Sequence, residues 1–87
     1  MINENVQFVE GVSSIKQLRE ALGLTQQDFA VKLGVTVTSV YRWESGRSDI
    51  TFTFPQMKKF HKEVLEPLNL NIHELPDNLG APYVKVA

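Results

Sequence analysis

The run Thr25–Arg47, TQQDFAVKLGVTVTSVYRWESGR, restricts most strongly what this chain can fold into. Apolar residues recur at helical spacing on both sides of Gly34. Most of the remaining side chains can donate hydrogen bonds. The pattern therefore predicts two short amphipathic helices, set at an angle by a glycine turn, with a surface that can dock against a polar partner.

Both predicted helices have recognisable starts and ends. Thr25 and Thr36 are placed as N-caps, since a threonine hydroxyl can accept a hydrogen bond from a free N–H group of the first turn. Gly34 and Gly46 can end the two helices, because glycine takes a left-handed backbone conformation without steric cost. The side chains expected to point inward are Phe29, Ala30, Leu33, Val40 and Trp43. Helical periodicity leaves Val37, Thr38, Tyr41, Arg42 and Ser45 on the outward face of the second helix.

Another helix is predicted before this run. Ser14 and Gln17 have the spacing of a capping box, in which both side chains bond to free N–H groups of a first turn. The apolar residues that follow, Ile15, Leu18 and Leu22, fall on one helical stripe. We expect a helix at residues 15–22 that ends at Gly23.

One more helix is predicted after the run. Thr53 and Pro55 mark its start, and Pro67 should end it near residue 65 or 66, because proline cannot continue a helix. Asn71 can cap one last turn at residues 72–75. Two aromatic side chains at the start of this region, Phe52 and Phe54, are expected to fold back onto the core.

The two ends of the chain contain short β-prone runs, at residues 6–9 and 83–86. They can be disordered, or they can pair within one chain or between two, because a lone strand leaves its backbone groups unpaired. The sequence therefore divides into an N-terminal arm or short strand at 1–13, a helical domain at 14–76 and a C-terminal tail or short strand at 77–87.

A chain of 87 residues holds one domain with one modest core. The absence of cysteine excludes disulfides and thiolate metal sites. We expect a cytoplasmic protein with no membrane partner, because no apolar run can span a bilayer and the N-terminus lacks the features of a secretory signal. The net charge is −1, yet residues 15–47 carry five basic and three acidic side chains, so the central run is the basic part.

The residues from Leu18 to Arg47 form the motif LR-x3-GLTQ-x2-FA-x2-LGV-x4-V-x2-WE-x-GR. This motif resembles the Xre/Cro/C1 family of phage-repressor-like DNA-binding domains, over about residues 14–75. The resemblance implies an all-α, repressor-like domain of four or five helices containing a helix-turn-helix, whose later helix enters the major groove of double-stranded DNA. It implies a transcriptional regulator, such as a repressor, that reads a short operator.

The resemblance also assigns roles to individual side chains. It implies that Val37, Thr38 and Arg42 face DNA bases, and a guanidinium can bond O6 and N7 of guanine together. The side chains implied to lie on or near the DNA backbone are Gln26, Thr36, Ser39, Tyr41, Ser45 and Arg47. Arg19 and Glu44 are implied to form an ion pair that ties the first helix to the end of the reading helix.

A single domain of this size makes few DNA contacts, so we expect a homodimer on two half-sites about 34 Å apart. The dimer surface would come from the helix after Thr53, the last turn or the β-prone ends. The alternative is an antitoxin-like or adaptor protein whose main ligand is another protein, such as a toxin or another regulator. The acidic pI near 6.1 and the apolar Val37 and Tyr41 on the outward face favour it.

Other functions find little support in the sequence. His61 and His73 have no cysteine or clustered carboxylate beside them, so we expect no metal site. No nucleophile lies next to a plausible base in a known motif and no glycine-rich phosphate loop is present, so we expect neither an enzyme nor a cofactor. No ligand pocket can be inferred from the sequence, because the core is small and no polar groups converge on it.

Overall fold

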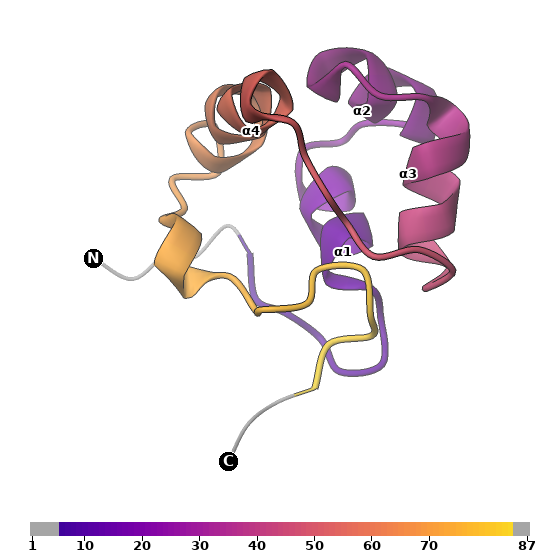
Figure 1. Cartoon of the computed structure of the whole chain (residues 1–87). Helices are drawn as coiled ribbons and strands as arrows, with labels where there is room; N and C mark the ends of the chain where they lie inside the picture. Colours follow the sequence, from indigo (N-terminus) through magenta and orange to yellow (C-terminus); the bar gives the residue numbers. More distant parts are fainter. Residues whose placement is uncertain (1–5, 85–87) are drawn as a thin grey trace.

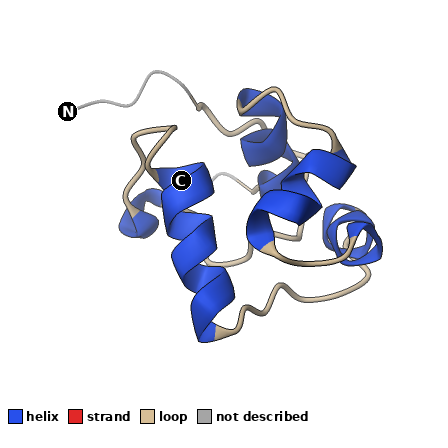
Figure 2. Cartoon of the chain, turned by 90° about the horizontal axis from the view of Figure 1, so that it is seen from above, coloured by secondary structure: helices blue, strands red, loops and turns tan. Residues whose placement is uncertain are grey.

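The structure is a computed structural model that describes residues 6–84. Within them the chain is all-α, as predicted (Figures 1 and 2). The helices are α1 (Ser14–Ala21), α2 (Gln26–Leu33), α3 (Val37–Glu44) and α4 (Phe54–Phe60), followed by a π-helical turn (His61–Leu65) and a 3-10 turn (Ile72–Glu74). None of the helices in this part of the chain is long and apolar enough to cross a membrane.

The predicted starts of α2, α3 and α4 are confirmed. The hydroxyl of Thr25 accepts a hydrogen bond from the backbone N–H of Asp28 at 3.1 Å, and Thr36 accepts one from Ser39 at the same distance. Thr53 forms a full capping box with Gln56 at the start of α4. These starts follow from local sequence, because a cap needs only an acceptor at the right spacing.

The start of α1 differs from the prediction. Ser14 lies inside the helix instead of capping it, and Ser13 occupies the N-cap, where its hydroxyl donates to the carbonyl of Leu79 at 3.4 Å instead of accepting from the first turn. Gln17 does not complete a capping box, because its amide bonds to the backbone of the preceding segment. It donates to the carbonyl of Val9 at 2.9 Å and accepts from the N–H of Val9 at 2.7 Å. Gln17, expected to cap α1, therefore bonds to the backbone of Val9, which lies outside the helix.

Side chains from all four helices form one core. Its buried members are Ile15, Leu18, Phe29, Ala30, Leu33, Val40, Trp43, Phe60, Val64, Leu65 and Leu68. Phe52, from the linker before α4, lies between two of them, with its ring 5.5 Å from Trp43 and 5.2 Å from Phe60. The inward face predicted for α2 and α3 is thus confirmed, as is the return of Phe52 to the core.

Phe54 contradicts its prediction. Its side chain is 74% exposed, and the ammonium group of Lys58 lies 4.9 Å from its ring centroid. The reason is its position as the first residue of α4, on the solvent side of the helix, one turn before Lys58. The helical ending was predicted correctly, since the π-helical turn stops at Leu65, shortly before Pro67.

The ends of the described chain meet, but not as predicted. Gly11 donates to the carbonyl of Tyr83 at 3.0 Å and Tyr83 donates to that of Val12 at 2.9 Å, beside a single bridge between Ser13 and Pro82. Residues 6–9 form no strand, and residues 85 and 86 of the second run lie outside the described residues. A longer ladder along residues 11–13 is blocked because proline has no N–H to donate.

The segment expected to be a tail or short strand from residue 77 onward instead packs on the helical domain. The carbonyl of Leu79 accepts a hydrogen bond of 2.7 Å from the N–H of Ile15, in the first turn of α1. Gly80 is buried, and a Cβ added to it would lie 3.3 Å from the carbonyl oxygen of Trp43. Figure 1 shows this yellow segment running back beneath α1. It supplies part of the N-terminal capping that α1 lacks in its own sequence.

Candidate nucleic-acid interface

Helices α2 and α3 are joined by a tight turn at Gly34. This glycine has a φ of 73°, a left-handed conformation that L side chains rarely adopt. The N–H of Val35 then donates to the carbonyl of Ala30 at 3.0 Å, which closes the end of α2. Ala30 is 1% exposed, and its small side chain lets the two helices approach closely. The local sequence therefore sets the angle at which α3 leaves the body of the protein.

Helix α3 has one buried and one exposed face. Val40 is fully buried and Trp43 is 5% exposed, so both belong to the core. The opposite face brings together the three side chains implied to read bases, Val37, Thr38 and Arg42, which are all exposed. Tyr41 lies on the same exposed side and is 51% accessible. An exposed face with aliphatic, hydroxyl, aromatic and guanidinium groups can contact both the edges of bases and their methyl groups.

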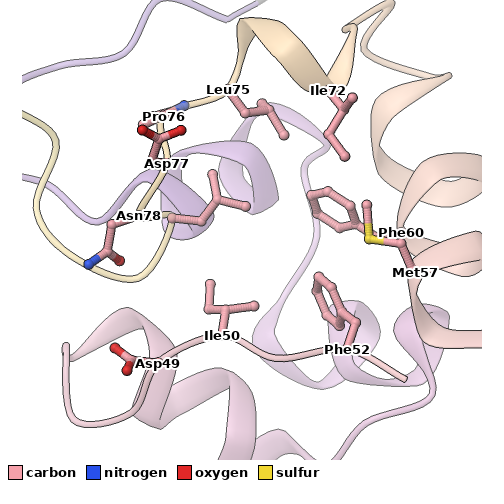
Figure 3. A pocket seen from close by; sticks show the side chains of 11 residues that line it. Asp49, Ile50, Phe52, Met57, Phe60, Ile72, Leu75, Pro76, Asp77 and Asn78 are labelled. Carbon is pink, nitrogen blue, oxygen red and sulfur yellow. The ribbon is translucent and has the colours of Figure 1, made fainter. Parts of the chain in front are cut away.

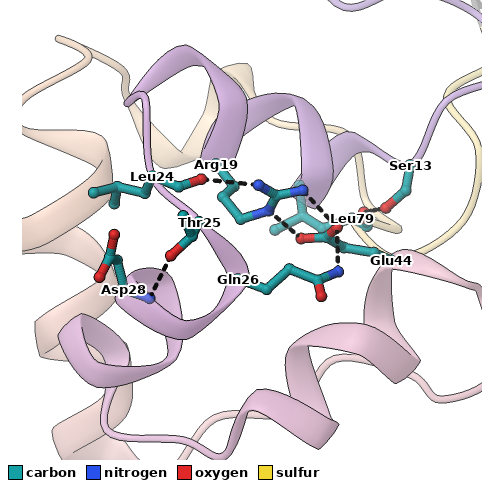
Figure 4. A network of polar contacts seen from close by, with 8 residues as sticks. All are labelled: Ser13, Arg19, Leu24, Thr25, Gln26, Asp28, Glu44 and Leu79. Atoms are coloured by element: carbon teal, nitrogen blue, oxygen red, sulfur yellow. Dashed lines mark hydrogen bonds and ion pairs between the residues drawn. The ribbon is translucent and has the colours of Figure 1, made fainter.

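An ion pair anchors the end of α3 to α1 (Figure 4). Arg19 donates from Nε to one carboxylate oxygen of Glu44 at 2.7 Å and from Nη2 to the other at 3.0 Å. Its third nitrogen, Nη1, donates to the carbonyl of Leu24 at 2.8 Å. Only 12% of the Arg19 side chain and 6% of the Glu44 side chain are exposed. The hydrogen bond with Glu44 raises the pKa of Arg19, against the lowering effect of its burial.

Gln26 joins the same network, a contact that the sequence analysis missed. Its amide nitrogen donates to Glu44 at 3.0 Å, which holds the side chain between α2 and α3. An amide carries two N–H donors, so one remains for another acceptor. Gln26 is also the first residue of α2, where backbone N–H groups are free and anions are favoured. No sequence signal linked Gln26 to Glu44, because the contact exists only once the helices pack.

The hydroxyl groups around α3 are partly engaged in local bonds. Thr36 donates to the hydroxyl of Ser39 at 3.0 Å while accepting from its N–H. Ser45 donates to the carbonyl of Arg42 at 3.2 Å. The hydroxyls of Thr36 and Ser45 would have to rotate to donate to a phosphate, whereas that of Ser39 only accepts and keeps its hydrogen for another acceptor. Arg47 is exposed, and its guanidinium carbon lies 6.0 Å from the ring centroid of Tyr41.

A polar groove of about 610 Å³ runs beside α3. Arg42 lines it together with Thr36 and Ser39, and the far side is formed by the segment after α3 and the start of α4. Asp49, which the sequence analysis did not consider, also lines this groove. Its carboxylate adds one negative charge near Arg42 and so restricts which partners can lie there.

The two histidines lie outside this surface. His61 contacts Glu66 at 3.2 Å on the π-helical turn, and His73 lies in the 3-10 turn. Residues 6–84 contain no group of three histidine or carboxylate side chains placed to hold a metal ion.

Comparison with known proteins gives one family. A family model described as helix-turn-helix matches residues 15–54, which span α1, α2, α3 and the linker to α4. No curated protein and no solved structure matches the chain.

Proposed function

We propose that this protein binds double-stranded DNA sequence-specifically through α3. The proposal starts from the family: residues 15–54 match the helix-turn-helix of the Xre/Cro/C1 family, whose members are DNA-binding transcription regulators. The observation that carries the proposal is the division of α3 into two faces. Val40 and Trp43 hold one face in the core, while the opposite face is exposed and kept at a defined angle by the Arg19–Glu44 pair. A rigidly held, exposed helix face suits the width of the major groove.

Base reading in this proposal rests on three side chains. Arg42 is exposed, and a guanidinium can donate two parallel hydrogen bonds to a guanine. Val37, which is 39% exposed, has no polar atom in its side chain and would contact a thymine methyl group. Thr38, between them in the sequence, can offer both a hydroxyl and a methyl group. Arg42 therefore supplies most of the discrimination between bases.

Contacts with the DNA backbone would come from the rim of this face. The free amide donor of Gln26 and the N-terminus of α2 favour a phosphate at that point. Arg47 follows the end of α3 and can reach a phosphate without a base contact. The remaining candidates for this rim are Thr36, Ser39, Tyr41 and Ser45. Such contacts position the domain and make its affinity depend on salt.

We further propose that two copies bind together. The domain measures 34 × 26 × 23 Å, so one copy covers about one turn of DNA, and two copies can occupy half-sites about 34 Å apart.

A second candidate function is binding to a protein partner. Val37 and Tyr41 are exposed apolar groups on the same face of α3, and aromatic side chains are enriched at protein interfaces. An antitoxin-like or adaptor protein could use this face for a toxin or another regulator. A partner that copurifies and covers α3, without retention of DNA, would favour this candidate.

The test begins with selection of duplexes from a random pool, followed by titration of binding to selected and random DNA over a range of salt concentrations. Arg42→Ala should relax the base preference by about 1–3 kcal/mol at one position. Arg47→Ala should weaken binding to all sequences alike and lower the salt slope by about one. Lys62→Ala, which removes a positive charge on the π-helical turn, serves as the control.

Two results would count against the proposal. Absence of salt-dependent binding to either kind of duplex would remove DNA as the ligand. Equal effects of the Arg42 and Arg47 variants on sequence preference would show that the reading face and the phosphate rim are wrongly assigned.

A further inference from the structure

An open pocket of about 530 Å³ lies on the other side of the linker that follows α3 (Figure 3). The linker between α3 and α4 forms one wall, and residues 72–79 form another. No pocket could be inferred from the sequence, because the residues that form its walls are brought together only by the packing of residues 72–79 on the linker. Pockets that hold small molecules commonly measure about 300–1,000 Å³, so this one is large enough for such a ligand.

One side of the pocket is apolar. Figure 3 shows the rings of Phe52 and Phe60 beside the thioether of Met57, with Ile72 above them. Phe60 is almost fully buried, so it forms a floor, whereas Ile72 is 44% exposed and leaves an apolar surface in contact with water. Covering Ile72 with an apolar group would remove that surface from water, which is favourable.

The other side carries negative charge. Asp77 and Asp49 lie at this side of the pocket, at its upper and lower corners in Figure 3, with Asn78 between them. Within residues 6–84, neither carboxylate takes part in an ion pair or side-chain hydrogen bond, and no lysine or arginine lines the pocket. Arg42 lies near Asp49 on the side of the neighbouring groove, but the lining of this pocket carries two negative charges and no positive one, which favours a positive charge at the rim.

We propose that this pocket binds a small hydrophobic cation, a molecule with an aromatic or aliphatic body and one amino group. The body lies against Phe52, Met57 and Ile72, where it covers exposed apolar surface. The ammonium group lies at the rim on the acidic side of the pocket, where the negative charges of Asp49 and Asp77 attract it. This arrangement satisfies both sides of the pocket, whereas an anion of the same shape would meet like charges.

The pocket adjoins the candidate nucleic-acid interface. Asp49 lines both this pocket and the groove that contains Arg42. Binding in the pocket nevertheless depends only on its own lining, so the proposal does not rest on DNA binding and can be tested without DNA.

The test uses three probes with one common body: phenylpropylammonium, phenylbutanoate and phenylpropanol. Each is titrated into the full-length protein and followed by NMR of backbone amides and of the methyl groups of Ile50, Ile72 and Leu75. The ammonium probe should saturate, with a Kd on the order of 1 mM for a molecule of this size. The alcohol should bind more weakly and the carboxylate least, with the shifted signals confined to the pocket.

The charge contribution is tested with Asp49→Asn and Asp77→Asn, which keep the shape of each side chain. Each change should weaken binding of the ammonium probe by roughly twofold to fivefold, the range for an exposed ion pair, and leave the alcohol unaffected. Glu20→Gln, which removes an exposed carboxylate on α1, is the matched control and should change neither probe.

Three outcomes would overturn the proposal. The first is equal binding of the ammonium and carboxylate probes to the unchanged protein. The second is a set of shifted signals spread over the surface away from residues 49–57 and 72–79. The third is unchanged affinity of the ammonium probe in both Asp49→Asn and Asp77→Asn. The comparison of probes on the unchanged protein gives a result even if one variant folds poorly.

Discussion

Glu44→Ala is the substitution with the clearest expected effect on this fold. It removes the carboxylate that accepts two hydrogen bonds from Arg19 and one from Gln26, at 2.7–3.0 Å. The change therefore separates α1 and α2 from the end of α3 without touching the apolar core. It also leaves a guanidinium in a site where only 12% of its side chain is exposed.

The magnitude follows from this burial. Removal of one partner from a buried ion pair costs about 3–5 kcal/mol, because the other charge remains uncompensated. Arg19 keeps its bond to the carbonyl of Leu24 and some access to water, which places the loss at the lower end, about 3 kcal/mol. For a domain of this size that corresponds to a fall in Tm of about 12–24 °C. We also expect weaker DNA binding, since the exposed face of α3 loses its fixed angle.

Thermal unfolding followed by circular dichroism measures the loss. The control is Glu63→Ala, which removes the carboxylate of a weaker pair with Lys32, at 3.8 Å and with side chains 44% and 35% exposed. Such an exposed pair should contribute less than about 1 kcal/mol. Adding Arg19→Ala to Glu44→Ala should cost little more than the single change, because it removes the uncompensated charge.

An unchanged Tm in Glu44→Ala would refute the reasoning. So would equal losses in Glu44→Ala and Glu63→Ala, because the burial of the first pair would then have no energetic consequence.

Three further outcomes are expected. The loss of stability caused by Glu44→Ala should be the same at about pH 7 and about pH 10. The reason is that the pKa of Arg19 is raised in the folded protein. The stability that this guanidinium contributes is therefore complete below its unfolded pKa and is lost only as the pH rises through the higher folded pKa. Gly34→Ala should destabilise the protein by about 1–2 kcal/mol, because the φ of this residue is 73°. Gly34→Asn should destabilise it less, since asparagine tolerates this conformation. Denaturant midpoints of the two variants would show whether alanine is the more destabilising of the two. Thr53→Ala should cost about 1 kcal/mol through loss of the capping box, whereas Thr51→Ala, at an exposed position outside any helix, should leave the urea midpoint nearly unchanged.

Much of the helical framework could be predicted because its signals are local. The caps at Thr25, Thr36 and Thr53 each bond to an N–H three residues later, so the spacing in the sequence already contains the geometry. The buried face of α3 follows in the same way from helical periodicity. Ser14 shows the limit of this reasoning, since its spacing from Gln17 was equally suitable.

The surface around α3 could be predicted only in part. Periodicity and the family motif placed Val37, Thr38 and Arg42 on one exposed face, and the structure puts them there. Neither indicated that Gln26 bonds to Glu44 or that Asp49 lies beside α3. These contacts join residues from different elements, and a one-dimensional pattern does not contain the distance between them.

The sequence by itself determined where α2, α3 and α4 begin, which faces of α2 and α3 are apolar and which residues turn the chain, because these depend on interactions within about one helical turn. Only the tertiary structure decided what the ends of the chain do. The carbonyl of Leu79 bonds to the first turn of α1, and Gly80 lies against Trp43. The same packing forms the pocket between Asp49 and Asp77. The physical reason is that each of these contacts joins residues far apart in the sequence and must replace hydrogen bonds to water. Whether such a contact forms therefore depends on how the assembled core places its two partners.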